Sequence, residues 1–183
     1  MNTDRDIMLR SREEPQAFAE IFERHARVVG AFIARRLGND AAQDVLSEAF
    51  LVAFRRRASF NVEYESARPW LFGIAVRLIA QHRRVEATQW QAIAAAESTR
   101  APNADDDVLR SERRMDAETQ ARGLAPRIAA LSDDDRDTLL LYAWGDLTYE
   151  QVADALEVPV GTVRSRLNRV RRTLREEDSD ARV

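Results

Sequence analysis

Apolar side chains recur at helical spacing in two separate stretches of this chain. They follow the 3.6-residue period of an amphipathic helix, and no stretch alternates apolar and polar residues as a half-buried strand would. The predicted helices cover residues 17–38, 40–58, 69–84, 132–144, 148–156 and 162–175. We therefore predict an all-α protein made of two small helical domains.

Local signals mark the ends of these helices and divide the chain. Gly38 ends the first helix, Pro69 stands in the first turn of the third, and Ser132 can cap the fourth. Residues 59–67 have weak periodicity and are predicted to form a loop. The chain is predicted to begin with a polar N-terminal extension (1–14), followed by a first domain (15–85). An acidic flexible linker (86–125), partly helical near 85–97, leads to a second domain (126–176) and an acidic tail (177–183).

The second domain has the sequence form of a helix-turn-helix. Thr148 and Gln151 have the spacing of a capping box, and residues 158–161 are predicted to form the turn before the last helix. In this motif the N-terminal part of the second helix enters the major groove. Arginine can pair there with guanine and asparagine with adenine. The residues predicted to contact DNA are Thr162, Arg164, Ser165, Arg166, Asn168, Arg169 and Arg171.

Charge is sorted along the chain in a way that supports this interpretation. The net charge of the whole chain is −3, yet residues 162–175 carry six arginines and no acid. Residues 131–157 carry eight acids and one arginine, which is a charge of −7. A basic segment of this kind is typical of a surface that meets phosphate. The acidic run at 133–137 either faces away from DNA, or faces a protein, or stabilises a helix N-terminus.

Several classes of protein are not expected from this sequence. It has no cysteine, no run of 18 apolar residues and no apolar stretch of a signal peptide near its N-terminus, which predicts a cytoplasmic protein without membrane insertion. His25 and His82 stand near apolar stripes, where packing is the expected role. No phosphate loop or nucleophile with a base appears, so we predict no catalytic residue, no cofactor and no metal site.

Four segments together resemble the bacterial sigma factors of the extracytoplasmic-function (ECF) class, in the sigma-70 family. The resemblance spans residues 15–85 and 125–175 in the order expected for that family. The C-terminal segments that carry it are 148–153 (TYEQVA) and 158–167 (VPVGTVRSRL). Those of the first domain are 39–50 (NDAAQDVLSEAF), similar to the polymerase-docking helix, and 68–75 (RPWLFGIA), similar to the promoter-melting helix.

The resemblance implies a promoter-specificity subunit. Such a protein binds the β′ and β subunits of core RNA polymerase. It recognises promoter DNA at the −35 and −10 elements and promotes melting of the DNA duplex, and an anti-sigma factor holds it inactive. The helix-turn-helix would read the −35 element. Polymerase docking would use Asp44, Glu48 and Phe50. Readout of the −10 element would use Phe60, Asn61, Tyr64, Arg68, Trp70, Arg77, Arg83 and Arg84.

Other interpretations remain open at this stage. Phe50 and Trp70 have core packing as an alternative role, and Asp44 and Glu48 could belong to a solvated face. A DNA-binding regulator whose first domain senses a ligand or dimerises would bind a palindromic duplex without polymerase. A pure protein-interaction module would show no salt-dependent DNA binding at all.

Overall fold

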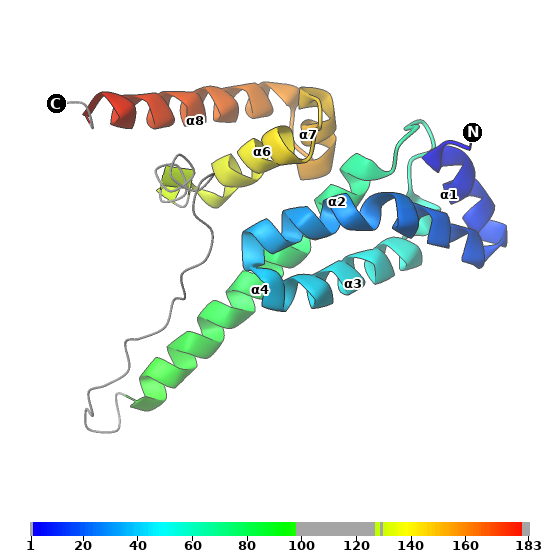
Figure 1. Cartoon of the computed structure of the whole chain (residues 1–183), viewed down its shortest axis with the longest axis horizontal. Coiled ribbons are helices and arrows are strands. Elements are labelled where there is room, and N and C mark those ends of the chain that lie inside the picture. The colour runs from blue at the N-terminus through cyan, green and yellow to red at the C-terminus, as the bar shows by residue number, and fades with distance from the viewer. Residues whose placement is uncertain (1, 98–126, 129, 181–183) are drawn as a thin grey trace, which may run out of the picture.

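The computed structural model describes residues 2–97, 127–128 and 130–180, and every regular element within these ranges is a helix. The prediction of an all-α fold is confirmed. The α-helices are α1 (Asp4–Glu13), α2 (Ala19–Leu37), α3 (Asn39–Arg55), α4 (Arg68–Glu97), α6 (Asp133–Trp144), α7 (Tyr149–Leu156) and α8 (Val160–Asp180) (Figure 1). Two short 3₁₀ helices, η1 (Pro15–Phe18) and η2 (Arg57–Ser59), stand between them. The predicted linker lies outside the described residues from 98 onward.

Helices α2, α3 and α4 pack around the core of the first unit. Gly38 joins α2 to α3 with φ at +82°, a backbone conformation that suits glycine. The predicted apolar stripes face inward, and the rings of Phe32 on α2 and Phe72 on α4 meet edge to face at 5.1 Å. Helix α4 passes without interruption through the predicted end at 84 and reaches Glu97.

Residues 1–14, expected only as a polar extension, contain a helix that packs into the first unit. Thr3 and Asp6 form a capping box at the start of α1, and the side chains of Ile7 and Met8 are fully buried. Only two apolar side chains of this short helix face the core, and charged residues surround them. That is too weak a pattern to predict the helix from sequence.

The second unit begins with two capped helices. The Ser132 hydroxyl accepts a hydrogen bond from the Asp135 N–H at 3.2 Å, and Thr148 with Gln151 closes the predicted capping box of α7. Glu157 ends α7 in the left-handed conformation, with φ at +56°. The predicted turn at 158–161 is wrong in its last two residues, because α8 begins at Val160. The carbonyl of Pro159 accepts the N–H groups of Thr162 and Val163, which places Gly161 inside the first helical turn.

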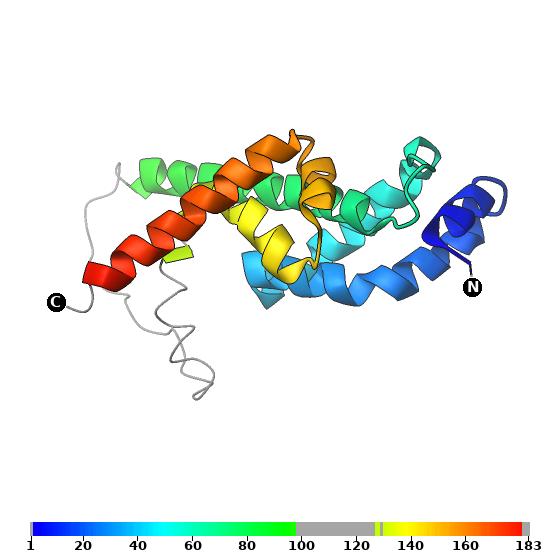
Figure 2. The same ribbon diagram turned by 90° about the horizontal axis from the view of Figure 1, so that it is seen from above.

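The two units pack on each other through α4 and α7 (Figures 1 and 2). At Gly73 on α4, a Cβ atom would lie 2.6 Å from the carbonyl oxygen of Ala155 on α7, so this position has no room for a larger residue while the units are in contact. Arg36 of α2 and Asp137 of α6 form a buried ion pair across the same boundary. Among the described residues, no helix combines the length and apolar character needed to span a bilayer.

Candidate nucleic-acid and polymerase interfaces

Helix α8 presents a charged outer face above an apolar inner stripe. Val163, Leu167 and Val170 are buried against α6 and α7, so the residues between them are directed outward. Arg164, Ser165, Asn168, Arg169 and Arg171 are exposed, and Thr162 and Arg166 are half-buried at the flanks. All seven residues predicted to read DNA in this domain therefore lie on the outer face of α8 or its flanks.

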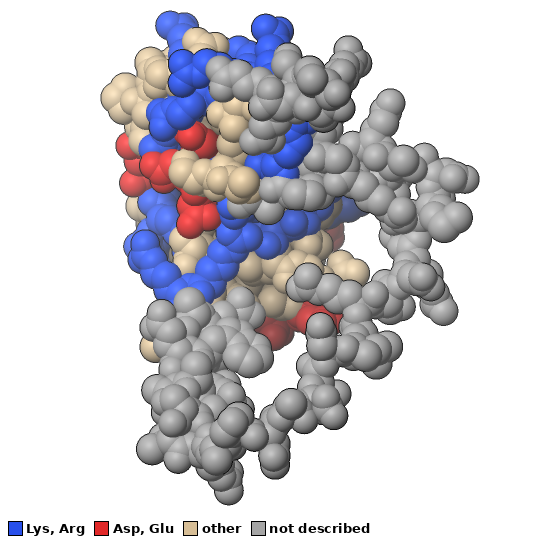
Figure 3. Space-filling view, turned by 90° about the vertical axis from the view of Figure 1, so that its left-hand side faces the viewer, with Lys and Arg blue, Asp and Glu red and all other residues tan. Residues whose placement is uncertain are grey.

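Acidic and phenolic groups of the same unit contact this basic face. Arg166 pairs with Asp134, and the guanidinium of Arg169 lies 3.5 Å from the carboxylate of Asp135. Arg171 donates to the hydroxyl of Tyr149 at 2.9 Å. Arginine and acidic side chains lie side by side on the face shown in Figure 3. Asp134 and Asp135 of the acidic run thus face the basic helix, and both also stand in the first turn of α6, where the helix N-terminus favours negative charge as one of the sequence alternatives had it.

The second basic surface combines the 59–67 loop with the first turns of α4. A cavity of about 550 Å³ opens between this surface and α7. Asn61 and Tyr64 are exposed and line it together with Trp70 and Arg77. Phe60 is 3% exposed, and its ring packs edge to face on that of Trp70 with 5.6 Å between the centroids. Phe60 is therefore a core residue beneath the cavity wall and not an exposed side chain of the loop. Tyr64 is therefore the aromatic side chain of the loop that solvent reaches most freely.

Carboxylates of the second unit meet the arginines of this surface. The guanidinium of Arg77 lies 2.8 Å from Glu157, that of Arg83 lies 3.4 Å from Asp133, and that of Arg68 lies 3.7 Å from Asp146. The charge of Asp154 is the main cause that raises the pKa of Tyr64. Arg84, the last residue of the predicted set, is exposed.

The boundary also contains a buried ion pair that sequence reasoning missed. Burial raises the pKa of Asp137 and lowers that of Arg36, so for each group desolvation outweighs the attraction of its partner. Arg36 and Asp137 are 101 positions apart, and nothing in the local pattern links them.

The surface predicted to dock on polymerase lies on α3 and differs in one residue from the expectation. Asp44 and Glu48 are exposed one turn apart. Phe50 is 6% exposed and its ring packs on Phe22 at 4.8 Å, which is the core alternative. The exposed apolar side chains here are Phe22 and Leu51, 45% and 47% accessible. Phe22 lies within the amphipathic helix predicted over 17–38, but the period alone does not tell that its ring is exposed.

The described residues contain no cluster of His, Asp and Glu that could hold a metal ion. His25 is buried, and its Nε2 atom lies 2.7 Å from the carboxylate of Asp4. His82 is half-buried on α4.

Comparison with known proteins assigns both units. Residues 21–88 match the family model described as Sigma-70 region 2, and residues 124–174 match the one described as Sigma-70, region 4. The chain is 31% identical over 178 residues to the ECF RNA polymerase sigma-E factor of Escherichia coli (strain K12), a match that covers 94% of this chain and 92% of that protein. The chain belongs to the ECF class of the sigma-70 family.

Further relatives agree with this assignment. The RNA polymerase sigma-H factor of Pseudomonas aeruginosa is 32% identical over 155 residues, which cover 81% of this sigma factor and 78% of that one. As a member of the family, the protein is a promoter-recognising specificity subunit of RNA polymerase.

Two solved structures share the fold. The structure of CnrH in complex with the cytosolic domain of CnrY aligns with a TM-score of 0.67 and 20% identity, over 97% of each chain. The sigma factor RpoE from Bartonella quintana, in complex with the anti-sigma factor NepR, aligns with a TM-score of 0.60 and 19% identity, over 87% of this chain and 94% of that one.

Proposed function

We propose that this sigma factor directs core RNA polymerase to promoters by reading two DNA elements with two separate surfaces. The outer face of α8 reads the −35 element as duplex. The 59–67 loop and the start of α4 bind the −10 element and help to open it. The observation that carries this proposal is that two arginine-rich surfaces lie on different units, and that each unit matches its own sigma-70 region.

The exposed face of α8 suits recognition of a duplex. An α-helix fits the major groove, and Arg164 and Asn168 project from its N-terminal half, where base edges are reached. Beside them stand Arg166, Arg169 and Arg171, which contact phosphates or bases. Arg166 pairs with an exposed carboxylate and Arg171 with a phenol, which DNA phosphate can replace, whereas Arg169 pairs with the buried carboxylate of Asp135.

The loop and α4 suit unpaired DNA. A base that leaves the duplex stack needs an aromatic face and a cation for its phosphate. Trp70 and Tyr64 supply aromatic faces on the wall of the cavity that the first unit forms, and Arg77 supplies the cation once α7 has moved away. Arg68, Arg83 and Arg84 extend the basic surface along α4 and follow the DNA backbone.

Docking on polymerase uses the exposed part of α3. Asp44 and Glu48 present two carboxylates on one helical face, and Leu51 with Phe22 adds an apolar edge. A basic, partly apolar partner helix is the complement of this surface. We infer that the β′ subunit supplies that helix and that the β subunit contacts the second unit.

The packing of α7 on α4 is incompatible with binding of the −10 element at the same surface. Glu157 and Asp146 occupy arginines that we assign to DNA, and α7 forms one wall of the cavity. We infer that the two units separate before the promoter binds, and that core polymerase holds them apart. An anti-sigma factor that stabilises the closed arrangement would keep the protein inactive.

In vitro transcription with core polymerase and a library of randomised promoters tests the proposal. We expect transcripts only when this protein is added, from templates that share one −35 and one −10 sequence. Free protein is expected to bind duplex DNA weakly and with strong salt dependence. Tight binding of a homodimer to a palindrome without polymerase would contradict the proposal and favour a conventional regulator.

A further inference from the structure

The N-terminal helix α1 holds the loop that precedes α4 at several points along its main chain. The guanidinium of Arg12 donates to the carbonyl of Phe60 at 3.3 Å, and that of Arg5 donates to the carbonyl of Glu63 at 2.9 Å. The main-chain N–H of Arg5 donates to the carbonyl of Glu65 at 3.3 Å. The loop is therefore attached to one short helix at its beginning, its middle and its end.

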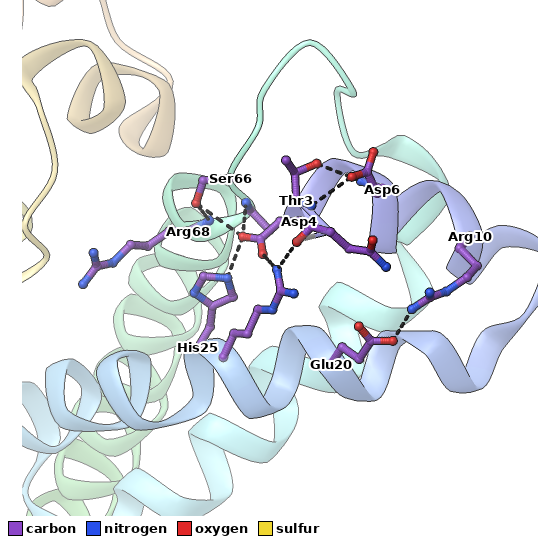
Figure 4. A network of polar contacts seen from close by, with 11 residues as sticks. Thr3, Asp4, Asp6, Arg10, Glu20, His25, Ser66 and Arg68 are labelled. Carbon is purple, nitrogen blue, oxygen red and sulfur yellow. Dashed lines mark hydrogen bonds and ion pairs between the residues drawn. The ribbon is translucent and has the colours of Figure 1, made fainter.

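The next contact fixes the start of α4 itself. Ala67 precedes the helix and has no side-chain oxygen that could cap it. Instead, the carboxylate of Asp4 accepts the N–H of Ala67 at 2.9 Å (Figure 4). The Ser66 hydroxyl accepts the N–H of Arg68 at 3.2 Å and lies 3.4 Å from the same carboxylate. A negative charge at this end of a helix is also favoured by the helix dipole.

Asp4 is anchored on its other side by helix α2. Its carboxylate lies 2.7 Å from Nε2 of His25 and accepts from the guanidinium of Arg24 at 3.0 Å. The residue is 7% exposed, and its position is secured by the burial of Ile7 and Met8 in the next turn of α1. The carboxylate thus connects α1, α2 and the beginning of α4 within one network.

These contacts spare the side chains that we assign to the −10 element. The atoms of the loop that α1 contacts are mainly main-chain carbonyl and N–H groups, while Asn61 and Tyr64 remain exposed at the cavity. A loop that must capture an unstacked base loses less conformational entropy if its main chain is already ordered.

We propose that α1 is a positioning element for promoter opening, with Asp4 and Arg5 as its positioning residues. It orders the main chain of residues 60–67 and the first turn of α4, so that the side chains of the loop meet the −10 element in a fixed geometry. This role rests on the proposed function of the loop, and the experiment below separates the two.

The central variant is Arg5→Ala, which removes the guanidinium bond to Glu63 and leaves the buried face of α1 intact. Arg10→Ala is its matched control, because Arg10 lies on the same helix but pairs with Glu20 of α2 (Figure 4). Asp4→Asn keeps the shape of the side chain and removes its charge. All three are prepared as the full chain and assembled with core polymerase.

Two measurements are made on each holoenzyme. Amide hydrogen exchange across residues 60–67 reports order in the loop, and permanganate reactivity of unpaired thymines reports opening of a promoter that the wild type selects. We expect Arg5→Ala and Asp4→Asn to exchange faster in the loop and to open the promoter about fivefold less, the factor that corresponds to one hydrogen bond of average net strength. Arg10→Ala is expected to match the wild type, and all variants to bind core polymerase equally.

The outcomes distinguish the possible failures. If Arg5→Ala loosens the loop but opens the promoter as well as the wild type, α1 has no positioning role. Equal loss in Arg10→Ala would also overturn it, because the effect would then reflect general destabilisation of α1. A wild-type holoenzyme that opens no promoter at all would refute the proposed function, and this role with it.

Discussion

At the scale of single residues, most arginines that we assign to DNA have a carboxylate or a hydroxyl as partner in the described arrangement. Such surface pairs contribute little to stability, since they are screened by solvent and cost side-chain entropy. Arg77 with Glu157 and Arg83 with Asp133 are of this kind. Phosphate can therefore replace these carboxylates at low cost, and the free protein loses little when the pairs exchange for DNA.

Arg164 provides the sharpest test of the −35 surface. Arg164→Glu is expected to weaken binding of the holoenzyme to its promoter by about 1–3 kcal/mol, because a base contact is lost and a like charge approaches phosphate. Arg175→Glu, which makes the same charge change near the end of α8, is the control. Promoter affinities are measured with duplexes that carry each single base change in the −35 element. An equal loss for both variants would show that charge alone, and not a base contact, explains the effect.

Asp4 makes stability depend on pH in the acid range. Burial alone would raise its pKa, but hydrogen bonds from His25 and the Ala67 N–H outweigh burial and hold the pKa at about 2, below its ordinary value of 3.8. Because the folded-state pKa is the lower one, ionised Asp4 stabilises the fold above about pH 4. That contribution is lost as the pH falls toward 2.

Asp4→Asn should therefore lower the free energy of unfolding at pH 7 by about 2 kcal/mol. The difference from the wild type should shrink as the pH falls from about 4 toward 2. Urea unfolding at several pH values measures both effects, with the exposed Glu14→Gln as control. A difference that stays constant across this pH range would contradict the assigned role of the carboxylate.

At the scale of elements, helix α3 divides its two faces between core and partner. Val45, Ala49 and Phe50 are buried against α2 and α4, while Asp44 and Glu48 face solvent. Substitution of Phe50 would damage the core as well as any interface, so it cannot test docking. The exposed acids can be changed without loss of packing.

The double variant Asp44→Arg with Glu48→Arg is expected to lose association with core polymerase, because two favourable charge pairs become repulsive. Thermal unfolding should change little. Co-purification with core enzyme and competition against the wild type measure the effect. The double variant Glu13→Arg with Glu14→Arg, at two exposed positions away from α3, is the control for the same change in net charge. Normal association of the double variant would place the docking surface elsewhere.

At the scale of the whole molecule, the closed arrangement depends on a close approach of two main chains. Gly73 of α4 faces the carbonyl of Ala155 of α7, and the nearest atom to an added Cβ there is this main-chain oxygen, at 2.6 Å. At Gly30 of α2, by contrast, the nearest atom to an added Cβ is a flexible side-chain carbon of Leu46, at 3.1 Å.

Gly73→Ala should therefore open the molecule while it favours the helical conformation of α4. We expect a larger radius of gyration in X-ray scattering and tighter binding of the free protein to duplex DNA. Gly30→Ala should leave both unchanged. If Gly73→Ala remains as compact as the wild type, the packing of α7 on α4 does not limit access to DNA.

The amphipathic periods of α2, α3, α4, α6, α7 and α8 and the caps at Ser132 and Thr148 could be predicted from sequence, because they depend on neighbours a few positions away; the end of α4 and the start of α8 were not. Ser132, Thr148 and Gly38 act within one turn of their own helix, and the stripe of α8 decides which arginines point outward. The basic face of α8 and the exposed acids of α3 follow from the same local rules. For Phe50, the sequence left core and surface open, because an aromatic residue suits both.

The tertiary structure alone decided what lies opposite each group. The helix α1 is stable only because Ile7, Met8 and Asp4 find partners on α2 and in the 59–67 loop, and its own pattern is too short to show this. The acidic run at 133–137 and the arginines that it meets belong to elements that are distant in sequence. Helical period and capping are local, whereas burial and charge pairing depend on how the chain returns on itself, which no short stretch of sequence contains.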